Sequence, residues 1–172
     1  MSPGSAGASA SRAGGASLEV EARDAAATRA IGEAFGRTAP EGAVVLLAGP
    51  LGAGKTTFAQ GVGRGCGVTG PITSPTYNLI LHYPGERHFT HVDLYRLDTP
   101  AELETLDLDE ILSGDGVTCV EWPEKLGERV WVPPPSAEVV IEPKPDGART
   151  LRVRLIGEGW EAARRRLAAA ER

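Results

Sequence analysis

With 172 residues, the chain is long enough for one domain with a full core and too short for two domains of ordinary size. Its formal net charge of -5 argues against the class of proteins that bind nucleic acid through a strongly basic surface. Any role with RNA is therefore expected to depend on a partner. No stretch is long and apolar enough for a signal peptide core or a membrane span, which predicts a cytoplasmic protein without a membrane partner.

The start of the chain differs in composition from the rest. Residues 1–17 are mainly Ser, Gly and Ala, and Met1 is their only large apolar side chain. Such a segment cannot offset its loss of entropy by burial, so we expect a disordered tail over residues 1–17 and a single domain over residues 18–172. The two cysteines, Cys66 and Cys119, do not have the spacing of a metal site and are expected to be buried, reduced thiols.

The first half of the domain alternates between strand and helix patterns. Residues 18–21 alternate as in a half-buried strand, and Asp24 can cap a helix that follows. The apolar positions of that helix have a 3.6-residue period: Ala27, Ile31, Ala34 and Phe35. Residues 43–48 form a continuous apolar run, as expected of a parallel strand covered on both faces. A second helix follows a glycine-rich loop, and three glycines weaken it: Gly61, Gly63 and Gly65.

The middle of the chain predicts two strands and a helix. Residues 77–83 and 88–95 alternate on either side of a Pro-Gly turn signal, which indicates two strands with a short connection. Thr99 then begins a run with a first-turn proline and a capping-box glutamate, so we expect a helix that contains Leu103 and Leu106.

The last part of the chain predicts a buried strand, a pair of strands and a helix. Residues 116–120 are apolar enough for a central strand. Three consecutive prolines separate it from two later strands, over residues 138–142 and 150–156. A final helix is expected over residues 159–172. The order of strands and helices indicates an α/β fold.

The segment GPLGAGKTT has the pattern of a phosphate-binding loop. It lies between a predicted buried strand and the start of a predicted helix, which is where phosphate-binding loops occur. Its backbone N–H groups and the positive end of the helix dipole would face the phosphates. Lys55 would reach the β- and γ-phosphates, and Thr56 would ligate Mg²⁺. The alternative is a glycine-rich turn with an incidental lysine. The predicted nucleotide-binding residues are Leu51, Gly52, Ala53, Gly54, Lys55, Thr56 and Thr57.

Two carboxylates qualify as the second anionic partner that Mg²⁺ needs at such a loop. Asp93 lies late in one predicted strand, and Glu121 directly follows the most continuously apolar one. Both would open onto the crevice outside the strand ends. We rank Glu121 first as metal ligand because its strand is the more central, and we expect Asp93 to orient the attacking water or to couple the metal to a moving loop. The alternative for either is a solvent-facing strand end.

Residues 73–76 lie where nucleotide switches place a segment that senses the γ-phosphate, and Ser74 and Thr76 are its candidate switch residues. An ordinary turn is an equally good interpretation. Tyr95 and Trp122 follow the two carboxylates and are candidates for coupling to a partner. For Trp122, packing in the core is the default expectation and covering the nucleotide is the alternative.

Four sequence blocks resemble the TsaE (YjeE) family, the small ATPases of bacterial tRNA threonylcarbamoyladenosine modification. In order, they are LLAGPLGAGKTTFAQGVGRGCGV, ITSPTYNLI, HVDLYRLDTPAELETLDLDEIL and CVEWPEKL. HVDLYRL together with VEWPE is much more specific than the phosphate loop. The resemblance extends roughly from Asp24 to Arg129, and it departs from the family at Pro50, where aspartate is usual and where proline lacks an N–H donor.

The resemblance implies a three-layer P-loop NTPase with a mostly parallel central sheet flanked by helices. It also implies that ATP and Mg²⁺ are bound, that Thr56 and Glu121 hold the metal, and that Asp93 and Trp122 are needed for activity. The implied partners are TsaD and TsaB, so tRNA would be reached only through their complex, and ATP hydrolysis would support the turnover of that complex. Contacts to adenine near Arg149, beyond the matching blocks, are a further expectation.

Two other classes of protein share the phosphate loop. A small-molecule kinase uses a second pocket and an arginine-bearing lid, and no such lid is apparent in the sequence. A GTP-driven conformational switch, without a tRNA role, normally has a guanine-reading Asn-Lys-x-Asp stretch, which the sequence lacks. Adenine is therefore favoured.

Overall fold

The structure, a computed structural model, describes residues 17–170. The predicted tail lies outside this range except for Ser17, which is the first residue of a strand. Within the described range, seven strands form one sheet: β1 (Ser17–Ala22), β2 (Ala43–Ala48), β3 (Ile80–Tyr83), β4 (Phe89–Asp93), β5 (Val117–Glu121), β6 (Ser136–Pro143) and β7 (Arg149–Ile156). The helices are α1 (Ala25–Thr38), α2 (Lys55–Gly65), α3 (Pro100–Glu104), α4 (Leu108–Leu112) and α5 (Glu161–Ala170), with a 3₁₀ turn, η1 (Pro123–Leu126).

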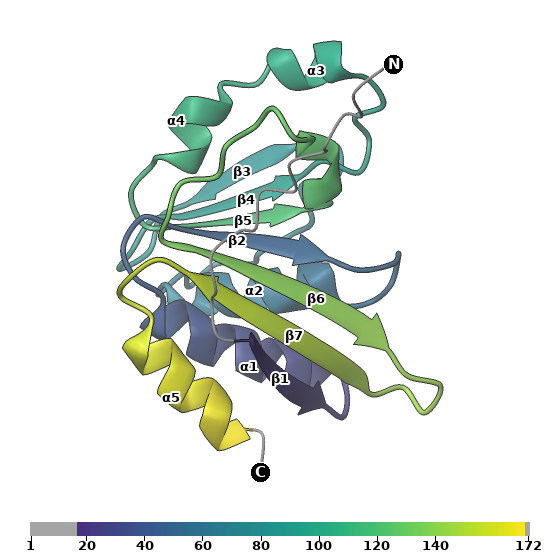
Figure 1. The fold of residues 1–172 in the computed structure, drawn as a ribbon, viewed down its shortest axis with the longest axis vertical. Helices are drawn as coiled ribbons and strands as arrows, with labels where there is room; N and C mark the ends of the chain where they lie inside the picture. The colour runs from purple at the N-terminus through teal and green to yellow at the C-terminus, as the bar shows by residue number, and fades with distance from the viewer. Residues whose placement is uncertain (1–16, 171–172) are drawn as a thin grey trace, which may run out of the picture.

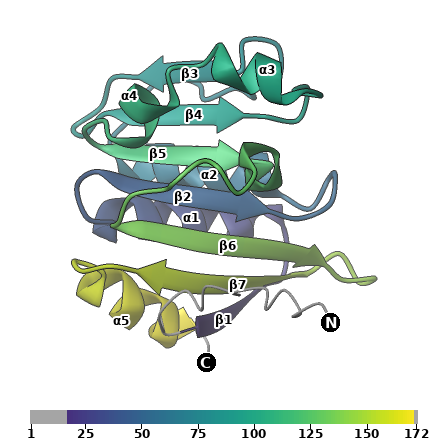
Figure 2. The ribbon, with the colours of Figure 1, turned by 45° about the horizontal axis from the view of Figure 1, so that its top comes forward.

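The sheet has a parallel centre and antiparallel edges. Its strand order is β1-β7-β6-β2-β5-β4-β3, which Figure 2 shows from β1 at the bottom to β3 at the top. The four central strands, β6, β2, β5 and β4, run parallel. β3 is antiparallel to β4, β7 is antiparallel to β6, and β1 is antiparallel to β7. The chain is therefore a mixed α/β protein whose parallel part is the centre of the sheet.

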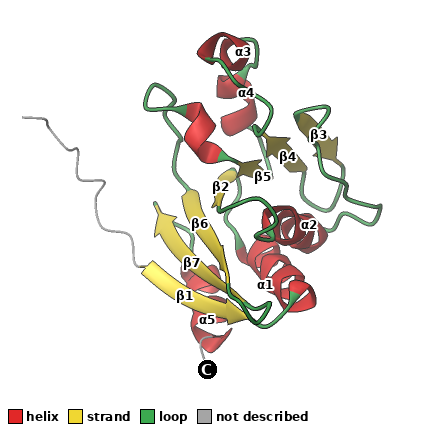
Figure 3. Cartoon of the chain, turned by 90° about the vertical axis from the view of Figure 1, so that its right-hand side faces the viewer, coloured by secondary structure: helices red, strands yellow, loops and turns green. Residues whose placement is uncertain are grey.

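Helices cover both faces of this sheet, as Figures 1 and 3 show. On one face, α1, α2 and α5 bury a large cluster in which the rings of Phe35, Phe58 and Trp160 pack together. On the other face, α3, α4 and η1 contribute Leu103, Leu112 and Leu126 to a second cluster. The arrangement buries the apolar runs of the central strands on both sides.

Two of the three glycines that the sequence suggested would weaken α2, Gly61 and Gly65, allow α1 to approach its backbone, whereas Gly63 faces Ile72 and Phe89. A Cβ on Gly61 would lie 2.2 Å from the carbonyl oxygen of Arg29, and one on Gly36 would lie 2.2 Å from that of Val62. Both distances are far below van der Waals contact, so a larger side chain would force the two helices apart. The helices also contain Gly32 and Gly65 at equally close contacts.

Most predicted elements are confirmed. Asp24 caps α1 by accepting a hydrogen bond of 2.8 Å from the backbone N–H of Ala27. Thr99 and Glu102 form the expected capping box at α3. Cys66 and Cys119 are buried free thiols. Among the residues that the structure describes, no helix has both the length and the apolar character needed to cross a membrane.

Several boundaries were predicted wrongly. The strand expected over residues 88–95 ends at Asp93, and the helix expected from residue 159 begins at Glu161. The strand expected from residue 77 begins only at Ile80, because Leu79 has a left-handed backbone (φ 60°) that a strand cannot accommodate, and the side chain of Tyr77 is exposed. The helix that begins after Thr99 ends at Glu104, so Leu106 lies outside it. A separate short helix, α4, follows, with the side chain of Asp107 as its cap.

Candidate nucleotide site

The glycine-rich loop between β2 and α2 has a backbone that few residues other than glycine adopt. Gly49, Gly52 and Gly54 have φ values of 146°, 78° and 110°. At Gly49, a Cβ would also lie 2.4 Å from the carbonyl oxygen of Ile141 in β6. The carbonyl oxygen of Pro50 accepts a hydrogen bond of 3.1 Å from the N–H of Ala53, which closes the loop. The loop is therefore a tight turn whose three glycines are required by their backbone conformation and, at Gly49, also by space.

Lys55, the first residue of α2, is only 4% exposed. Its Nζ donates hydrogen bonds to the carbonyl oxygens of Gly49 (2.7 Å) and Pro50 (2.8 Å) and lies 4.1 Å from the ring centroid of Trp122. Burial lowers the pKa of the Lys55 ammonium, and the nearby carboxylates, led by Glu121, oppose this shift. A cation is thus held inside the loop, at a site where an anionic ligand would compensate for its loss of hydration.

The two candidate carboxylates lie side by side at the ends of neighbouring parallel strands. Asp93 is the last residue of β4 and Glu121 the last residue of β5, and they are directly opposite each other in the strand register. Both side chains are almost completely buried. They lie at the carboxyl ends of the parallel strands, where α/β sheets bind their ligands.

Glu121 is joined to the glycine-rich loop through Thr56. Thr56 Oγ1 donates to the Glu121 carboxylate, 2.8 Å from Oε1 and 3.1 Å from Oε2. A hydroxyl oxygen and a carboxylate at hydrogen-bond distance are the donor types that Mg²⁺ prefers, and both line the pocket that contains Lys55. The residues present therefore fit a magnesium ion.

Asp93 is joined to the predicted switch segment instead. Its Oδ2 accepts a hydrogen bond of 3.2 Å from Thr76 Oγ1, which in turn lies 2.6 Å from Ser74 Oγ. Its Oδ1 accepts a hydrogen bond of 3.0 Å from the backbone N–H of Tyr95. Asp93 thus connects the segment before β3 with the turn after β4.

One pocket of about 360 Å³ brings nearly all the predicted site residues together. Its lining residues are Leu51, Gly52, Gly54, Lys55, Thr56, Thr57, Ser74, Thr76, Asp93, Tyr95, Glu121, Trp122 and Arg149. The exception is Ala53, which is fully buried in the loop and whose carbonyl oxygen accepts a hydrogen bond of 3.3 Å from Arg149 Nε. Arg149, the first residue of β7, therefore contacts the backbone of the glycine-rich loop at Ala53.

Trp122 combines the expected core packing with a place in the pocket lining. Its backbone is left-handed (φ 59°), which turns the chain sharply after β5. The indole is half-buried, packs partly on the second core cluster and lines the pocket, with its ring 5.0 Å from the ring of Tyr95. The two aromatic side chains thus form one wall of the pocket.

Sequence reasoning missed His91, whose side chain is completely buried beneath Glu121. Its Nε2 lies 2.7 Å from Glu121 Oε1. The signal was present in the alternation of β4, which places His91 on the same face of the sheet as Asp93, two residues later.

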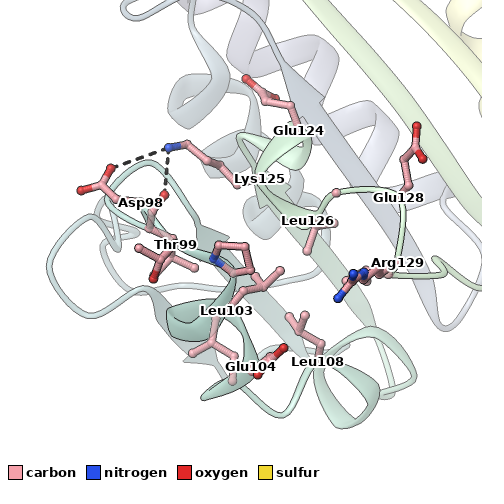
Figure 4. A pocket seen from close by; sticks show the side chains of 15 residues that line it. Asp98, Thr99, Leu103, Glu104, Leu108, Glu124, Lys125, Leu126, Glu128 and Arg129 are labelled. Carbon is pink, nitrogen blue, oxygen red and sulfur yellow. Dashed lines mark hydrogen bonds and ion pairs between the residues drawn. The ribbon is translucent and has the colours of Figure 1, made fainter.

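A larger pocket, of about 740 Å³, lies outside this site, and none of the predicted site residues line it. Figure 4 shows its leucine side chains, among them Leu103 and Leu126, between α3 and the chain that follows η1. Lys125 crosses one end, where Nζ donates to the carbonyl oxygen of Leu97 (2.8 Å) and lies 4.0 Å from Asp98 Oδ1.

Comparison with known proteins relates the chain to one family. The family model described as "Threonylcarbamoyl adenosine biosynthesis protein TsaE" matches residues 22–151. Relatives named "tRNA threonylcarbamoyladenosine biosynthesis protein TsaE" include one from Synechocystis, 44% identical over 115 residues, or 64% of this chain and 73% of the relative. The relative from Bacillus subtilis is 37% identical over 135 residues, or 78% of this chain and 83% of the relative. The relative from Treponema pallidum is 35% identical over 131 residues, or 76% of this chain and 96% of the relative.

A solved structure shares the fold. The crystal structure of Bacillus subtilis YdiB superimposes with a TM-score of 0.75 at 29% sequence identity, over 92% of this chain and 99% of that one. The family match covers the glycine-rich loop, both strand-end carboxylates and Trp122. The chain therefore belongs to the TsaE family of threonylcarbamoyl adenosine biosynthesis proteins.

Proposed function

We propose that the chain is a Mg²⁺-dependent ATPase that supports threonylcarbamoyladenosine modification of tRNA. The observation that carries the proposal is the convergence of Lys55, Thr56, Asp93 and Glu121 on one pocket beside the glycine-rich loop. The names of the relatives supply the tRNA modification. Because tRNA modification is the role in those names, we also propose a cytoplasmic location.

We propose further that residues 18–172 form a single P-loop ATPase domain with three layers. The order of a buried strand, a glycine-rich loop and a helix supports this assignment, since phosphate-binding loops occur in that order. The parallel strands at the centre, with helices on both faces, agree with it. ATP is favoured over GTP because the sequence contains no Asn-Lys-x-Asp stretch.

In this proposal, the loop binds the triphosphate through the backbone N–H groups of residues 51–57 and through Lys55. The Nζ of Lys55 leaves the carbonyl oxygens of Gly49 and Pro50 and donates to phosphate oxygens instead. Its positive charge, held in a site with little water, stabilises the negative charge that develops on the transferred phosphoryl group.

Thr56 and Glu121 are the residues that would hold Mg²⁺, which supplies charge neutralisation at the phosphates when it is bound. Thr56 can take this role while it keeps its contact with Glu121, because a hydroxyl can offer a lone pair to the metal and donate its proton to the carboxylate. Asp93 is the second carboxylate of the pocket, and its hydrogen bond from Thr76 supports the interpretation that it couples the site to a moving loop. The same carboxylate can orient the attacking water.

The output of hydrolysis is proposed to be a change in how the protein binds TsaD and TsaB. Residues 73–76 end at a hydrogen bond to Asp93, so a change at the phosphates can alter the order of this segment. Tyr95 and Trp122 line the same pocket in contact with each other, and the exposed Tyr95 is available to a partner. The role with tRNA is indirect, through the partner complex, as the net charge of -5 suggests.

Hydrolysis of ATP and GTP, measured side by side with and without the TsaD–TsaB pair, tests this function. We expect slow hydrolysis of ATP by the isolated chain, stimulation by the pair, and little hydrolysis of GTP. Hydrolysis that does not respond to the pair, although the complex forms, would argue against the proposed output. Transfer of the γ-phosphate to a small molecule would favour the kinase alternative.

A further inference from the structure

His91 occupies a position that the proposed site does not yet explain. It lies in β4, its side chain is fully buried, and Nε2 is 2.7 Å from Glu121 Oε1. In the strand register, His91 is opposite Cys119, two residues before Glu121 on the same face of the sheet. The imidazole therefore lies directly beneath the carboxylate, on the side away from the pocket.

The surroundings of the imidazole determine which nitrogen carries the proton. An ionised carboxylate only accepts hydrogen bonds, and Glu121 already accepts one from Thr56. The other ring nitrogen, Nδ1, is buried without a hydrogen-bond partner among the described residues. A proton on Nδ1 would thus be buried without an acceptor, whereas a proton on Nε2 is donated to Glu121.

We propose that His91 is a positioning residue that fixes the Glu121 carboxylate for metal binding. This inference rests on the proposed function, because it assumes that Thr56 and Glu121 hold Mg²⁺. Thr56, the other side-chain contact of the carboxylate in the structure, would itself be a ligand of the metal, so His91 is the contact that holds Glu121 from outside the set of metal ligands. A donor behind a ligating carboxylate holds its orientation and increases metal affinity.

The alternative role, that of a space-filling core residue, explains the histidine poorly. Phe89 packs against the imidazole, with ring centroids 6.0 Å apart, so the neighbourhood on that side is apolar. A phenylalanine would fill such a site without burying a nitrogen that has no partner. The contact with Glu121 is the feature of this site that needs a histidine.

Two substitutions separate positioning from packing. His91→Phe keeps a planar ring but removes the donor, and His91→Gln keeps an N–H donor at a similar reach. We would measure the Mg²⁺ concentration that half-saturates binding of a fluorescent ATP analogue, and the affinity for the same analogue in EDTA. His91→Phe is expected to raise the half-saturating Mg²⁺ concentration by about 10- to 100-fold and to leave the affinity in EDTA unchanged. His91→Gln should restore most of the loss.

His82→Phe is the matched control, because His82 lies in β3 and contacts Thr90, on the opposite face of the sheet from Glu121. Its Mg²⁺ dependence should equal that of the wild type. The inference is overturned if His91→Phe retains the wild-type Mg²⁺ dependence, or if His91→Gln is as impaired as His91→Phe. If the wild type itself binds the analogue without any Mg²⁺ dependence, the proposed function fails instead.

A measurement on the unaltered protein keeps the inference testable if the variants do not fold. In the wild type labelled with ¹⁵N-histidine, the nitrogen chemical shifts of His91 report which ring nitrogen carries the proton. We expect protonation at Nε2. Protonation at Nδ1 alone would mean that His91 cannot donate to Glu121, and it would overturn the inference.

Discussion

The ammonium group of Lys55 lies over the indole of Trp122, with Nζ 4.1 Å from the ring centroid. In this position the ammonium donates hydrogen bonds to the carbonyl oxygens of Gly49 and Pro50. Binding of both the β- and the γ-phosphate by the same Nζ would end at least one of these contacts, because the ammonium has three donors and two are in use. The environment of Trp122 is therefore expected to report occupancy of the loop.

Titration with ATP should change the tryptophan emission of the wild-type protein, and Trp122→Phe should abolish that change while ATP still binds. Lys55→Ala should weaken ATP binding by about 10- to 100-fold, since a charged hydrogen-bond donor to the phosphates is lost. Isothermal titration provides the affinities. For the emission change, Trp131→Phe is the control, because Trp131 is exposed outside the pocket, and this variant should keep the change. Unchanged ATP affinity in a folded Lys55→Ala variant would refute the site.

Glu121→Gln should keep most nucleotide binding but lose hydrolysis, because an amide offers the metal a neutral oxygen in place of an anionic one. We expect a decrease in turnover of about 100-fold or more, by analogy with the loss of a charge-stabilising group in other active sites. Asp93→Asn provides the comparison, since Asp93 lies directly opposite in the register. If Asp93→Asn weakens Mg²⁺ binding and Glu121→Gln does not, the ranking of the two carboxylates is reversed.

Thr76→Ala should reduce the coupling between ATP and the partners more than it reduces ATP binding. The substitution removes the hydrogen bonds of Thr76 Oγ1 to Asp93 and Ser74. By linkage, a partner that prefers the ATP-bound shape tightens ATP binding by the same factor by which ATP tightens partner binding. ATP affinity measured with and without the TsaD–TsaB pair gives this factor. Equal affinities in the wild type, with complex formation verified separately, would show that no such switch exists.

Gly61→Ala should destabilise the fold by about 1–3 kcal/mol, the usual cost of overpacking, because its Cβ would lie 2.2 Å from the carbonyl oxygen of Arg29 in α1. Urea denaturation measures the difference. Gly70→Ala is the control, since a Cβ there has no neighbour within 4 Å. Equal stability of the two variants would mean that α1 and α2 can separate without cost.

Alkaline pH should destabilise the protein through Cys66. Burial raises the pKa of its thiol from 9.0 to about 11. Below pH 9 both states are protonated, whereas between these two values the unfolded thiol ionises and the folded one does not, so the free energy of unfolding falls as pH rises. The expected loss is about 2–3 kcal/mol by pH 11. Urea denaturation from pH 8 to 10.5 measures this effect. The free energy of unfolding of Cys66→Ala should fall less with rising pH than that of the wild type.

Local patterns predicted the elements of this fold well, for identifiable reasons. The apolar run of β2 and the capping residues Asp24 and Thr99 each act within one element, so their effects can be read from neighbouring residues. The placement of Asp93 and Glu121 at strand ends followed from the same patterns. Their catalytic roles stay predictions, as do the switch or partner-coupling roles of Ser74, Thr76, Tyr95 and Trp122.

The features that the sequence did not reveal all depend on residues far apart in the chain. His91 gains its significance only when β4 and β5 pair, which places it beneath Glu121. Gly61 and Gly65 of α2 look like weak helix formers until α1 is packed against them. The large pocket between α3 and the chain after η1 likewise exists only once both segments are in place.

The pairing of β1 with β7 has a consequence for the order of assembly on the ribosome. Ser17 pairs with Arg154 and Ala22 with Arg149, so the first strand of the described chain has its neighbour near the other end. A chain that emerges from its N-terminus presents β1 long before β7 is synthesised. The unpaired edge of β1 is thus exposed throughout most of translation, when it is open to pairing with other nascent chains. β1 is thus synthesised well before the strand that it pairs with, and it is among the last of the described strands to be built into the sheet.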